Sequence, residues 1–183
     1  MKKSLLKATV LILAVSSLAA VFAGCGKTQT AEQNHVNPSQ AQVSDNNVSE
    51  LEVSFGYGGK AFVLHLEENP TAATLVEAAG IANLDLPIYH YDDYENWEIM
   101  QYYAVPSRYE IPTDPQTVTS EKAGEVYFDE NNRIVLFYRD GEIEGQFTKI
   151  GYFDYSEEFL SAVENNPVLE DWGNKIVSIR RKK

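Results

Sequence analysis

Two runs of residues that favour β-strands surround a polar turn near the middle of the chain. The first run covers residues 123–128 and the second covers residues 134–138. The turn between them is rich in Asn and Asp, which tolerate turn conformations, so the pattern predicts a β-hairpin. The second run contains five consecutive apolar or aromatic residues and has no polar face, because side chains alternate between the two faces of a strand. We therefore expect a central strand that is covered on both sides.

A second hairpin is predicted before this one, followed by a helix. Apolar residues at every second position predict strands over residues 51–55 and 61–66, with a glycine-rich turn between them. Asn69 can then cap a helix, Pro70 has the preset φ of a first helical residue, and Gly80 can close the far end. We expect this short helix to pack on the sheet.

Further strands and a second helix complete the predicted domain. Strands are expected over residues 86–91, 97–104, 147–153 and 176–179. Residues 105–122 contain three prolines and predict a long irregular connection. Ser156 precedes two glutamates and predicts the start of the second helix. A mainly β fold of about eight strands and two short helices suits a closed or nearly closed barrel whose ends the helices cap.

The amino terminus has the composition of an export signal. Three lysines within the first seven residues precede an apolar run that is too short to span a membrane comfortably. Residues 21–25 resemble a bacterial lipobox, in which small residues before a cysteine allow lipid attachment to its thiol and cleavage just ahead of it. We therefore expect residues 1–24 to be a lipoprotein signal peptide and Cys25 to be lipidated. The alternative is an ordinary secretory signal cleaved near Ala23, and both alternatives place the protein outside the cytoplasm.

Residues 25–49 are expected to form a disordered tether ahead of a single domain over residues 50–183. The tether is polar and cannot bury enough apolar surface to offset the entropy cost of ordering. Removing the first 24 residues takes away three lysines and no acid, so the formal net charge changes from −12 to −15. Such a charge disfavours nucleic acid and anionic membrane surfaces as partners of the domain. Cys25 is the sole cysteine, so an apolar core must stabilise the fold.

The order and spacing of four segments resemble the bacterial cyclophilin-like domain family, several members of which are predicted lipoproteins. The segments are Asn69 to Ala72, Ala123 to Val126, Ile134 to Tyr138 and Thr148 to Asp154. The resemblance covers about residues 50–183 and implies a cyclophilin-like β-barrel. It does not imply prolyl isomerase activity, because true cyclophilins carry a strand Arg followed by a Phe-Met-Gln-Gly-Gly type of run, which this chain lacks.

Residue patterns that mark hydrolases and metal sites are missing from the sequence. The domain has no cysteine and no Gly-x-Ser-x-Gly turn for a nucleophile. The acids of residues 92–95 have no EF-hand spacing, which favours a solvated loop over a Ca²⁺ site. His65 and His90 lack the spacing of a zinc helix. We expect no cofactor and no metal.

An aromatic stretch provides the candidate binding face. The candidate residues are Tyr89, Tyr91, Trp97, Tyr103 and Arg108. Each predicted strand carries its aromatic candidates on one side, so pairing of the two strands would gather them into a patch. Tyr and Trp beside an Arg anchor peptide or sugar ligands at little entropy cost. Alternatively this face fills the core, and the tyrosines are large barrel residues.

The sequence thus predicts a monomeric lipoprotein on the extracytoplasmic face of the cell membrane. Its expected partners are membrane lipid through Cys25 and a peptide or glycan ligand. The alternative function is peptidyl-prolyl isomerisation, for which Arg108 is the candidate catalytic arginine outside the central hairpin.

Overall fold

The described part of the protein is mainly β, with two α-helices. A computed structural model describes residues 48–88, 91–169 and 173–182, so the predicted signal peptide and Cys25 lie outside the described residues. The strands in this part are β1 (Glu50–Phe55), β2 (Ala61–Leu66), β3 (Leu84–Ile88), β4 (Met100–Ala104), β5 (Gln116–Val118), β6 (Glu125–Asp129), β7 (Arg133–Phe137), β8 (Gly145–Phe153) and β9 (Lys175–Arg181). The helices are α1 (Pro70–Ile81), α2 (Glu157–Glu164) and the short 3-10 helix η1 (Ser107–Tyr109).

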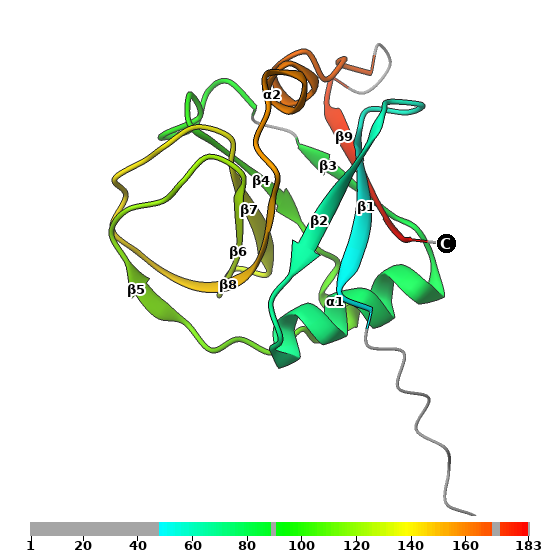
Figure 1. The fold of residues 1–183 in the computed structure, drawn as a ribbon, viewed down its shortest axis with the longest axis vertical. Helices are drawn as coiled ribbons and strands as arrows, with labels where there is room; N and C mark the ends of the chain where they lie inside the picture. Colours follow the sequence, from blue (N-terminus) through cyan, green and yellow to red (C-terminus); the bar gives the residue numbers. More distant parts are fainter. Residues whose placement is uncertain (1–47, 89–90, 170–172, 183) are drawn as a thin grey trace, which may run out of the picture. The chain divides into compact units, whose positions relative to one another are not determined.

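The strands form one antiparallel sheet in the order β3-β9-β1-β2-β8-β6-β7-β4, and β5 pairs with β8 outside this order. The sheet bends so far that its two outermost strands, β3 and β4, pack against each other (Figure 1). No hydrogen-bonded ladder joins these two strands within the described residues. The prediction of a mainly β fold with two short helices is confirmed, with nine strands in place of about eight, but the sheet is not closed.

β6 and β7 form the predicted hairpin, but the prediction of a central strand is wrong in position, because β7 lies next to the outermost strand β4. The side chain of Asp129 organises the turn of the hairpin, because Oδ1 accepts hydrogen bonds from the backbone N–H groups of Asn131 and Arg133, each at 3.0 Å. Asn132 has a φ of 60°, a left-handed conformation that Asn adopts more readily than most residues. The polar turn therefore fixes the register in which the two apolar runs pair.

β7 is buried on both faces, as its uninterrupted apolar sequence predicts. Ile134 and Leu136 point into the main core inside the curved sheet. Val135 and Phe137 point the other way and form a second cluster with Tyr127 of β6. Partly buried side chains of β5, of β8 and of the segment between β7 and β8 cover this second cluster: Val118, Phe147 and Ile143. No residue from Ile134 to Phe137 is more than 3% exposed.

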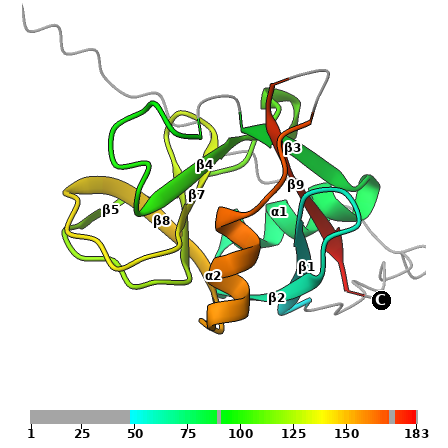
Figure 2. The ribbon, with the colours of Figure 1, turned by 90° about the horizontal axis from the view of Figure 1, so that it is seen from above.

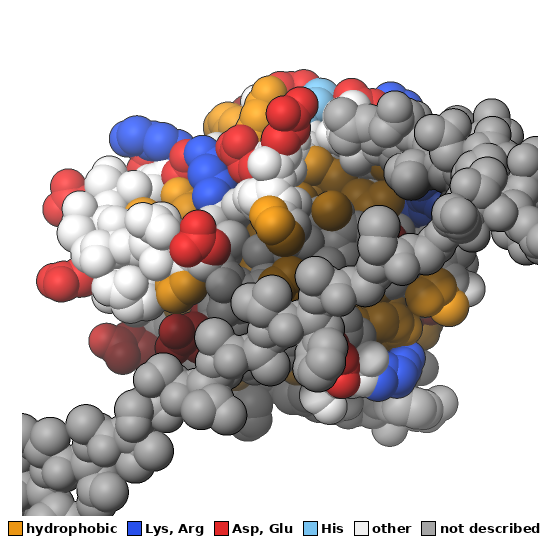
Figure 3. Space-filling model, turned by 90° about the horizontal axis from the view of Figure 1, so that it is seen from below, with side chains coloured by type: hydrophobic (Ala, Val, Ile, Leu, Met, Phe, Trp, Pro, Cys, Tyr) orange, Lys and Arg blue, Asp and Glu red, His pale blue; other side chains and the backbone are white. Residues whose placement is uncertain are grey.

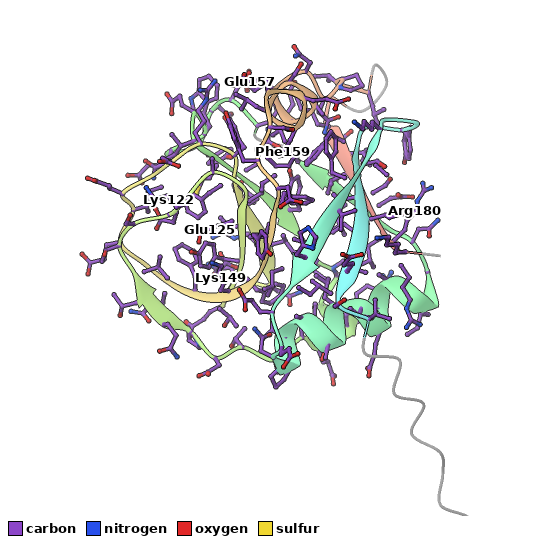
Figure 4. All side chains as sticks on the ribbon, viewed as in Figure 1. Lys122, Glu125, Lys149, Glu157, Phe159 and Arg180 are labelled. Carbon is purple, nitrogen blue, oxygen red and sulfur yellow. The ribbon has the colours of Figure 1, made fainter. Side chains whose placement is uncertain are left out.

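α2 covers one end of the main core. The Oγ of Ser156 caps the helix by accepting a hydrogen bond from the N–H of Phe159 at 3.1 Å, and two glutamates follow in the first turn, as predicted. Phe159 is completely buried and points from α2 into the domain (Figure 4). Its ring centroid lies 4.9 Å from that of Phe153 and 5.8 Å from that of Phe55. Aromatic contacts therefore fix α2 to β1 and β8.

α1 lies at the opposite end of the domain from α2 (Figures 1 and 2). Asn69 caps the helix by accepting a hydrogen bond from the N–H of Ala72 at 2.9 Å, and Pro70 is the first helical residue, as predicted. Figure 3 shows this end of the molecule, where hydrophobic side chains gather between scattered charged ones. None of the helices in the described ranges is long and apolar enough to cross a membrane.

The predicted role of Gly80 as the end of α1 is wrong. The helix continues to Ile81, and Ala82 is its cap. Gly80 lies where a Cβ atom would come within 2.9 Å of the Cδ atom of Arg181 on β9. The glycine therefore leaves room for the Arg181 side chain beside α1.

A buried carboxyl group holds the segment 141–143 beside the second cluster. The side chain of Glu121 is 0% exposed. Its backbone exchanges two hydrogen bonds of 3.0 Å with Gly141, and its Oε2 atom accepts a third from the N–H of Ile143 at 3.2 Å. Its Oε1 atom has no partner among the residues described. Burial raises the pKa of this carboxyl, and the charge of Glu125 adds to the rise, while the bond from Ile143 opposes it.

We predict that Glu121→Gln removes a pH dependence of stability. The folded protein keeps the proton of Glu121 at pH values at which the unfolded chain has lost it, so the free energy of unfolding falls as the pH rises from the ordinary Glu pKa of 4.5 to the raised value of the folded state. Glutamine retains an acceptor for Ile143 and cannot ionise. The variant should therefore gain stability relative to the wild type as the pH rises above the ordinary Glu pKa of 4.5, as measured by urea unfolding.

Glu142→Gln is the matched control, because Glu142 is an exposed acid of the same segment. It should follow the wild-type pH profile. The account is contradicted if Glu121→Gln loses as much stability as the wild type across this pH range.

Candidate functional site

The aromatic stretch does not form the paired strands that the sequence predicts. β3 ends at Ile88 and pairs with β9, whereas β4 begins at Met100 and pairs with β7. Residues 91–99 between them form bends and turns, and Tyr89 lies outside the described residues. The predicted pairing of these two segments is therefore wrong, although β3 and β4 pack side by side.

Tyr103 lies in the core. Its side chain is 2% exposed, and its hydroxyl donates a hydrogen bond to the Oε1 atom of Gln101 at 2.9 Å. Burial raises its pKa well above the ordinary value of tyrosine. For this residue the structure supports the alternative in which the tyrosines are large residues of the fold, rather than the exposed face.

Arg108 lies beyond the other end of β4, in η1. Its guanidinium group is 4.7 Å from the ring centroid of Tyr109, and its Nη2 atom donates a hydrogen bond to the hydroxyl of that residue at 3.0 Å. Trp97 precedes the five residues of β4 and Arg108 follows them, a separation of about 16 Å along an extended strand. The structure thus does not bring Arg108 beside Trp97, as a patch or an isomerase site built on both residues would require.

Tyr91 and Trp97 line an open hollow of about 500 Å³, a volume typical of small-ligand sites. The other walls come from β4, from the end of β7, from the end of α2 and from the start of β9. The lining residues are Tyr91, Asp92, Trp97, Glu98, Gln101, Tyr138, Arg139, Glu164 and Lys175. A second hollow of about 370 Å³ beside the start of α1 is lined without aromatic or cationic side chains. We therefore take the hollow beside Trp97, called the Trp97 hollow below, as the candidate site.

The end of β7 holds the segment that carries Trp97. The hydroxyl of Tyr138 donates a hydrogen bond to the backbone oxygen of Trp97. The backbone N–H groups of Tyr138 and Arg139 both donate to the backbone oxygen of Ile99, at 3.0 and 3.2 Å. Burial, and to a lesser degree the charge of Glu164, raises the pKa of Tyr138 to about 12, so its hydroxyl remains a donor at neutral pH. The indole of Trp97 is 37% exposed and is thus presented from a fixed position.

The two cationic side chains of the hollow differ in their partners. The Nη2 atom of Arg139 forms an ion pair with the carboxylate of Glu164, which raises the pKa of the arginine. The Nζ atom of Lys175 lies 4.8 Å from the ring centroid of Tyr91 and donates a hydrogen bond to the backbone oxygen of Glu164 at 3.2 Å. Burial lowers the pKa of Lys175, and the charge of Asp92 partly offsets this effect. Arg139 therefore has a counter-ion, whereas the Lys175 ammonium forms no ion pair with a carboxylate in the described part of the chain.

Gln101 adds a buried polar group to the lining. Its side chain is 3% exposed, and its Oε1 atom is already bonded to the Tyr103 hydroxyl. Its amide nitrogen donates to no residue in the described part of the chain. The hollow thus combines an aromatic surface with N–H donors that a ligand can engage.

Sequence reasoning did not assign Gln101, Tyr138 or Lys175 to the site. Lys175 reaches the hollow because β9 pairs with β3, which places it opposite Ile88. That pairing joins segments about 90 residues apart and leaves no local pattern. For Tyr138 a signal was present, since it extends the apolar run of β7 beyond the end of the strand.

Within the ranges that the structure describes, no group of three or more His, Cys, Asp or Glu side chains is placed to hold a metal ion. His65 lies partly buried on β2. Its Nδ1 atom is 3.3 Å from Glu50 and its Nε2 atom is 3.2 Å from Asp154. These contacts give the histidine a structural role on the sheet surface.

Comparison with known proteins identifies the family. A family model described as the cyclophilin-like family matches residues 55–174. The chain belongs to the cyclophilin-like family. The match spans every lining residue of the hollow in this cyclophilin-like domain except Lys175, which directly follows it.

One solved structure supports the fold of the cyclophilin-like domain. The structure of McbB in complex with tryptophan has a TM-score of 0.51 and a sequence identity of 15%. The similarity covers 72% of this chain and 44% of the McbB chain, so the protein spans less than half of the McbB length. At this identity the similarity shows the fold alone. A search of curated proteins found no match.

We predict that Trp97→Ala and Tyr103→Ala differ in their effects on stability. Tyr103→Ala should lower the free energy of unfolding by about 3 to 5 kcal/mol, because it leaves a cavity in the core and an unpaired Gln101 oxygen. Trp97→Ala should lower it by about 1 to 2 kcal/mol, because the indole is partly exposed. Urea unfolding of the two variants measures both values. Equal losses would show that Trp97 is a core residue and would remove it from the site.

Proposed function

We propose that the protein is a membrane-anchored extracytoplasmic lipoprotein whose cyclophilin-like domain binds peptides in the Trp97 hollow. The observation that carries this proposal is the composition of the hollow, in which partly exposed aromatic rings lie beside the N–H donors of Gln101 and Lys175, and neither donor group is bonded to a carboxylate of the described residues. Tyr and Trp provide a large contact area at little entropy cost, which suits them to binding peptide side chains. The donors of Gln101 and Lys175 suit the oxygen atoms of a peptide.

A peptide suits the hollow better than a neutral glycan does. Glycans also stack on aromatic rings, but a neutral sugar offers no charge to the half-buried ammonium group of Lys175. Peptides supply both apolar side chains for Trp97 and charged groups for Lys175. Peptide binding therefore uses more of the features of the site.

We further propose that the curved sheet acts as a nearly closed barrel of the cyclophilin type. β3 and β4 pack against each other at the open edge, and the hollow lies where β3 ends and β4 begins. Such an arrangement supports the site with a rigid scaffold while leaving its rim open to a ligand.

The proposed lipid anchor would hold the domain at the cell surface. Val48, the first described residue, borders the start of α1, whereas the hollow borders the end of α2, at the opposite end of the domain (Figure 1). A flexible tether of about 24 residues would hold the domain some 25 to 30 Å from the lipid on average. The attachment point and the proposed binding site would then lie at different ends of the domain.

The binding proposal is tested with a soluble mixture of random pentapeptides, half with free and half with amidated C-termini. The full chain is immobilised, and the retained peptides are quantified by mass spectrometry. The wild type should retain a defined subset, and Trp97→Ala should retain about tenfold less or lower, the loss expected for a central aromatic contact. Arg108→Ala is the matched control and should retain the wild-type set, because Arg108 lies beyond the far end of β4.

The proposal fails if the wild type retains no peptide above background. It also fails if Arg108→Ala abolishes retention while Trp97→Ala does not, since the site would then lie at η1. A neutral oligosaccharide of N-acetylglucosamine, tested in the same way, should not be retained.

The anchoring proposal is tested with Cys25→Ala. The variant should remain uncleaved or be released from the membrane, because the thiol that would carry the lipid is missing. Cell fractionation and the apparent mass of the protein measure both outcomes, with Trp97→Ala as the processing control. Unchanged processing and membrane retention of Cys25→Ala would overturn the proposed anchor.

A further inference from the structure

Lys175 differs from most other cationic residues of the described domain. Ion pairs with acids occupy the cationic groups of Lys60, Lys122, Arg133, Arg139, Lys149 and Lys182. Lys175 is half-buried and forms no ion pair with a described carboxylate, although the chain as a whole carries a formal charge of −12. Partial burial of an ammonium group without a counter-ion costs free energy. The hydrogen bond to the Glu164 carbonyl and the contact with the Tyr91 ring hold this ammonium group in place, but neither contact supplies a negative charge.

A second donor lines the same hollow. The Gln101 amide nitrogen donates to none of the residues described, and the Gln101 oxygen is held by Tyr103. Because Tyr103 is itself fixed in the core, the direction of the Gln101 amide is set by the fold. Lys175 and Gln101 thus supply donors from β9 and β4, two strands that do not pair with each other.

We infer that the Trp97 hollow binds the C-terminal carboxylate of a peptide, with the Lys175 ammonium and the Gln101 amide as hydrogen-bond donors and Trp97 in contact with the last side chain. This inference rests on the peptide-binding function proposed above. A carboxylate presents two acceptor oxygens and one negative charge, which match one cationic and one neutral donor. Arg139 already has Glu164 as a counter-ion at its Nη2 atom, whereas Lys175 forms no ion pair with a described carboxylate, so the lysine is the cation assigned to the ligand.

The partial burial of Lys175 favours the same ligand. Burial lowers the pKa of Lys175 because the ammonium group has lost part of its hydration. An approaching carboxylate adds to the negative charge that Asp92 supplies beyond ion-pair distance, and the gain is larger in a partly buried site than in water. Asp92 and Glu98 also line the hollow, and they disfavour an additional acid elsewhere in the ligand. The carboxylates of Asp and Glu side chains share this chemistry, so the experiment must separate them from the chain terminus.

Two pools of random pentapeptides with identical side-chain composition make this separation, one with free and one with amidated C-termini. Both pools contain Asp and Glu, and only the first contains the terminal carboxylate. The immobilised full chain should retain about ten to a hundred times more of the free-acid pool, the ratio expected for charge-assisted hydrogen bonds. Lys175→Met should lose this preference, and Lys175→Arg should keep most of it.

Two controls separate binding from folding. Lys182→Met removes the lysine that follows the other end of β9 and should keep the preference for the free acid. Lys175→Met should change the unfolding temperature little, because the loss of the hydrogen bond to Glu164 and of the contact with Tyr91 is offset by the removal of a partly buried charge. A purely structural lysine would instead lower the unfolding temperature when it is replaced.

Equal retention of the two pools by the wild type overturns the inference and leaves peptide binding intact. If the wild type retains both pools equally and the retained peptides are enriched in Asp and Glu, the hollow binds side-chain carboxylates, and the inference is also overturned. If Lys175→Met still prefers the free-acid pool, the Lys175 ammonium is not the donor to the terminal carboxylate, and the inference is overturned. If the wild type retains neither pool, peptide binding itself fails, and the inference fails with it.

Discussion

The burial of β7 on both of its faces is the constraint on which the domain depends. A strand without a polar face requires a layer of apolar side chains on each side, and full burial of each large side chain contributes about 1.5 to 3 kcal/mol. On one side, the curved sheet and its two helices supply the main core. On the other side, Val118, Ile143 and Phe147 cover Val135 and Phe137. β5 and the segment after β7 thus form a cover on the outer face of the curved sheet. This cover keeps the apolar outer face of β7 out of water.

The same strand positions the candidate site. Tyr138 and Arg139 directly follow β7, and their backbone N–H groups hold the backbone oxygen of Ile99. The Tyr138 hydroxyl holds the backbone oxygen of Trp97, while Arg139 connects to α2 through Glu164. An irregular segment thus carries the exposed indole, and a rigid strand fixes the segment. Functional sites commonly combine variable loops with a rigid scaffold in this way.

Local patterns in the sequence predicted the parts of the fold that local forces determine. The alternation in β1, the unbroken apolar run of β7 and the helix caps Asn69 and Ser156 each act within a few residues, and the structure confirms them. The polar residues of the central turn also act locally, through the carboxylate of Asp129. Sequence reasoning therefore located the core and both helices.

The candidate site was harder to predict because it depends on contacts between distant segments. Trp97 was assigned to a strand, but Asn96 has a φ of 65° and turns the chain just before it. The ring of Tyr94 packs on Tyr102 at 4.8 Å, so alternating aromatic residues here stabilise a folded loop rather than a strand. β5 was missed because three residues among prolines give too short a signal. The place of Lys175 follows from the pairing of β9 with β3, which no local pattern records.

Native-state amide hydrogen exchange tests the central role of β7 most directly. If β7 organises the domain, its amides and those of β6 exchange only by global unfolding and form the slowest class. The amides of Tyr138 and Arg139 should then exchange in the same class or the next one, since they fix the Trp97 segment to that strand. Faster exchange in β7 than in β1 and β2 would contradict the account, because the strand buried on both faces would not be the most stable part of the domain.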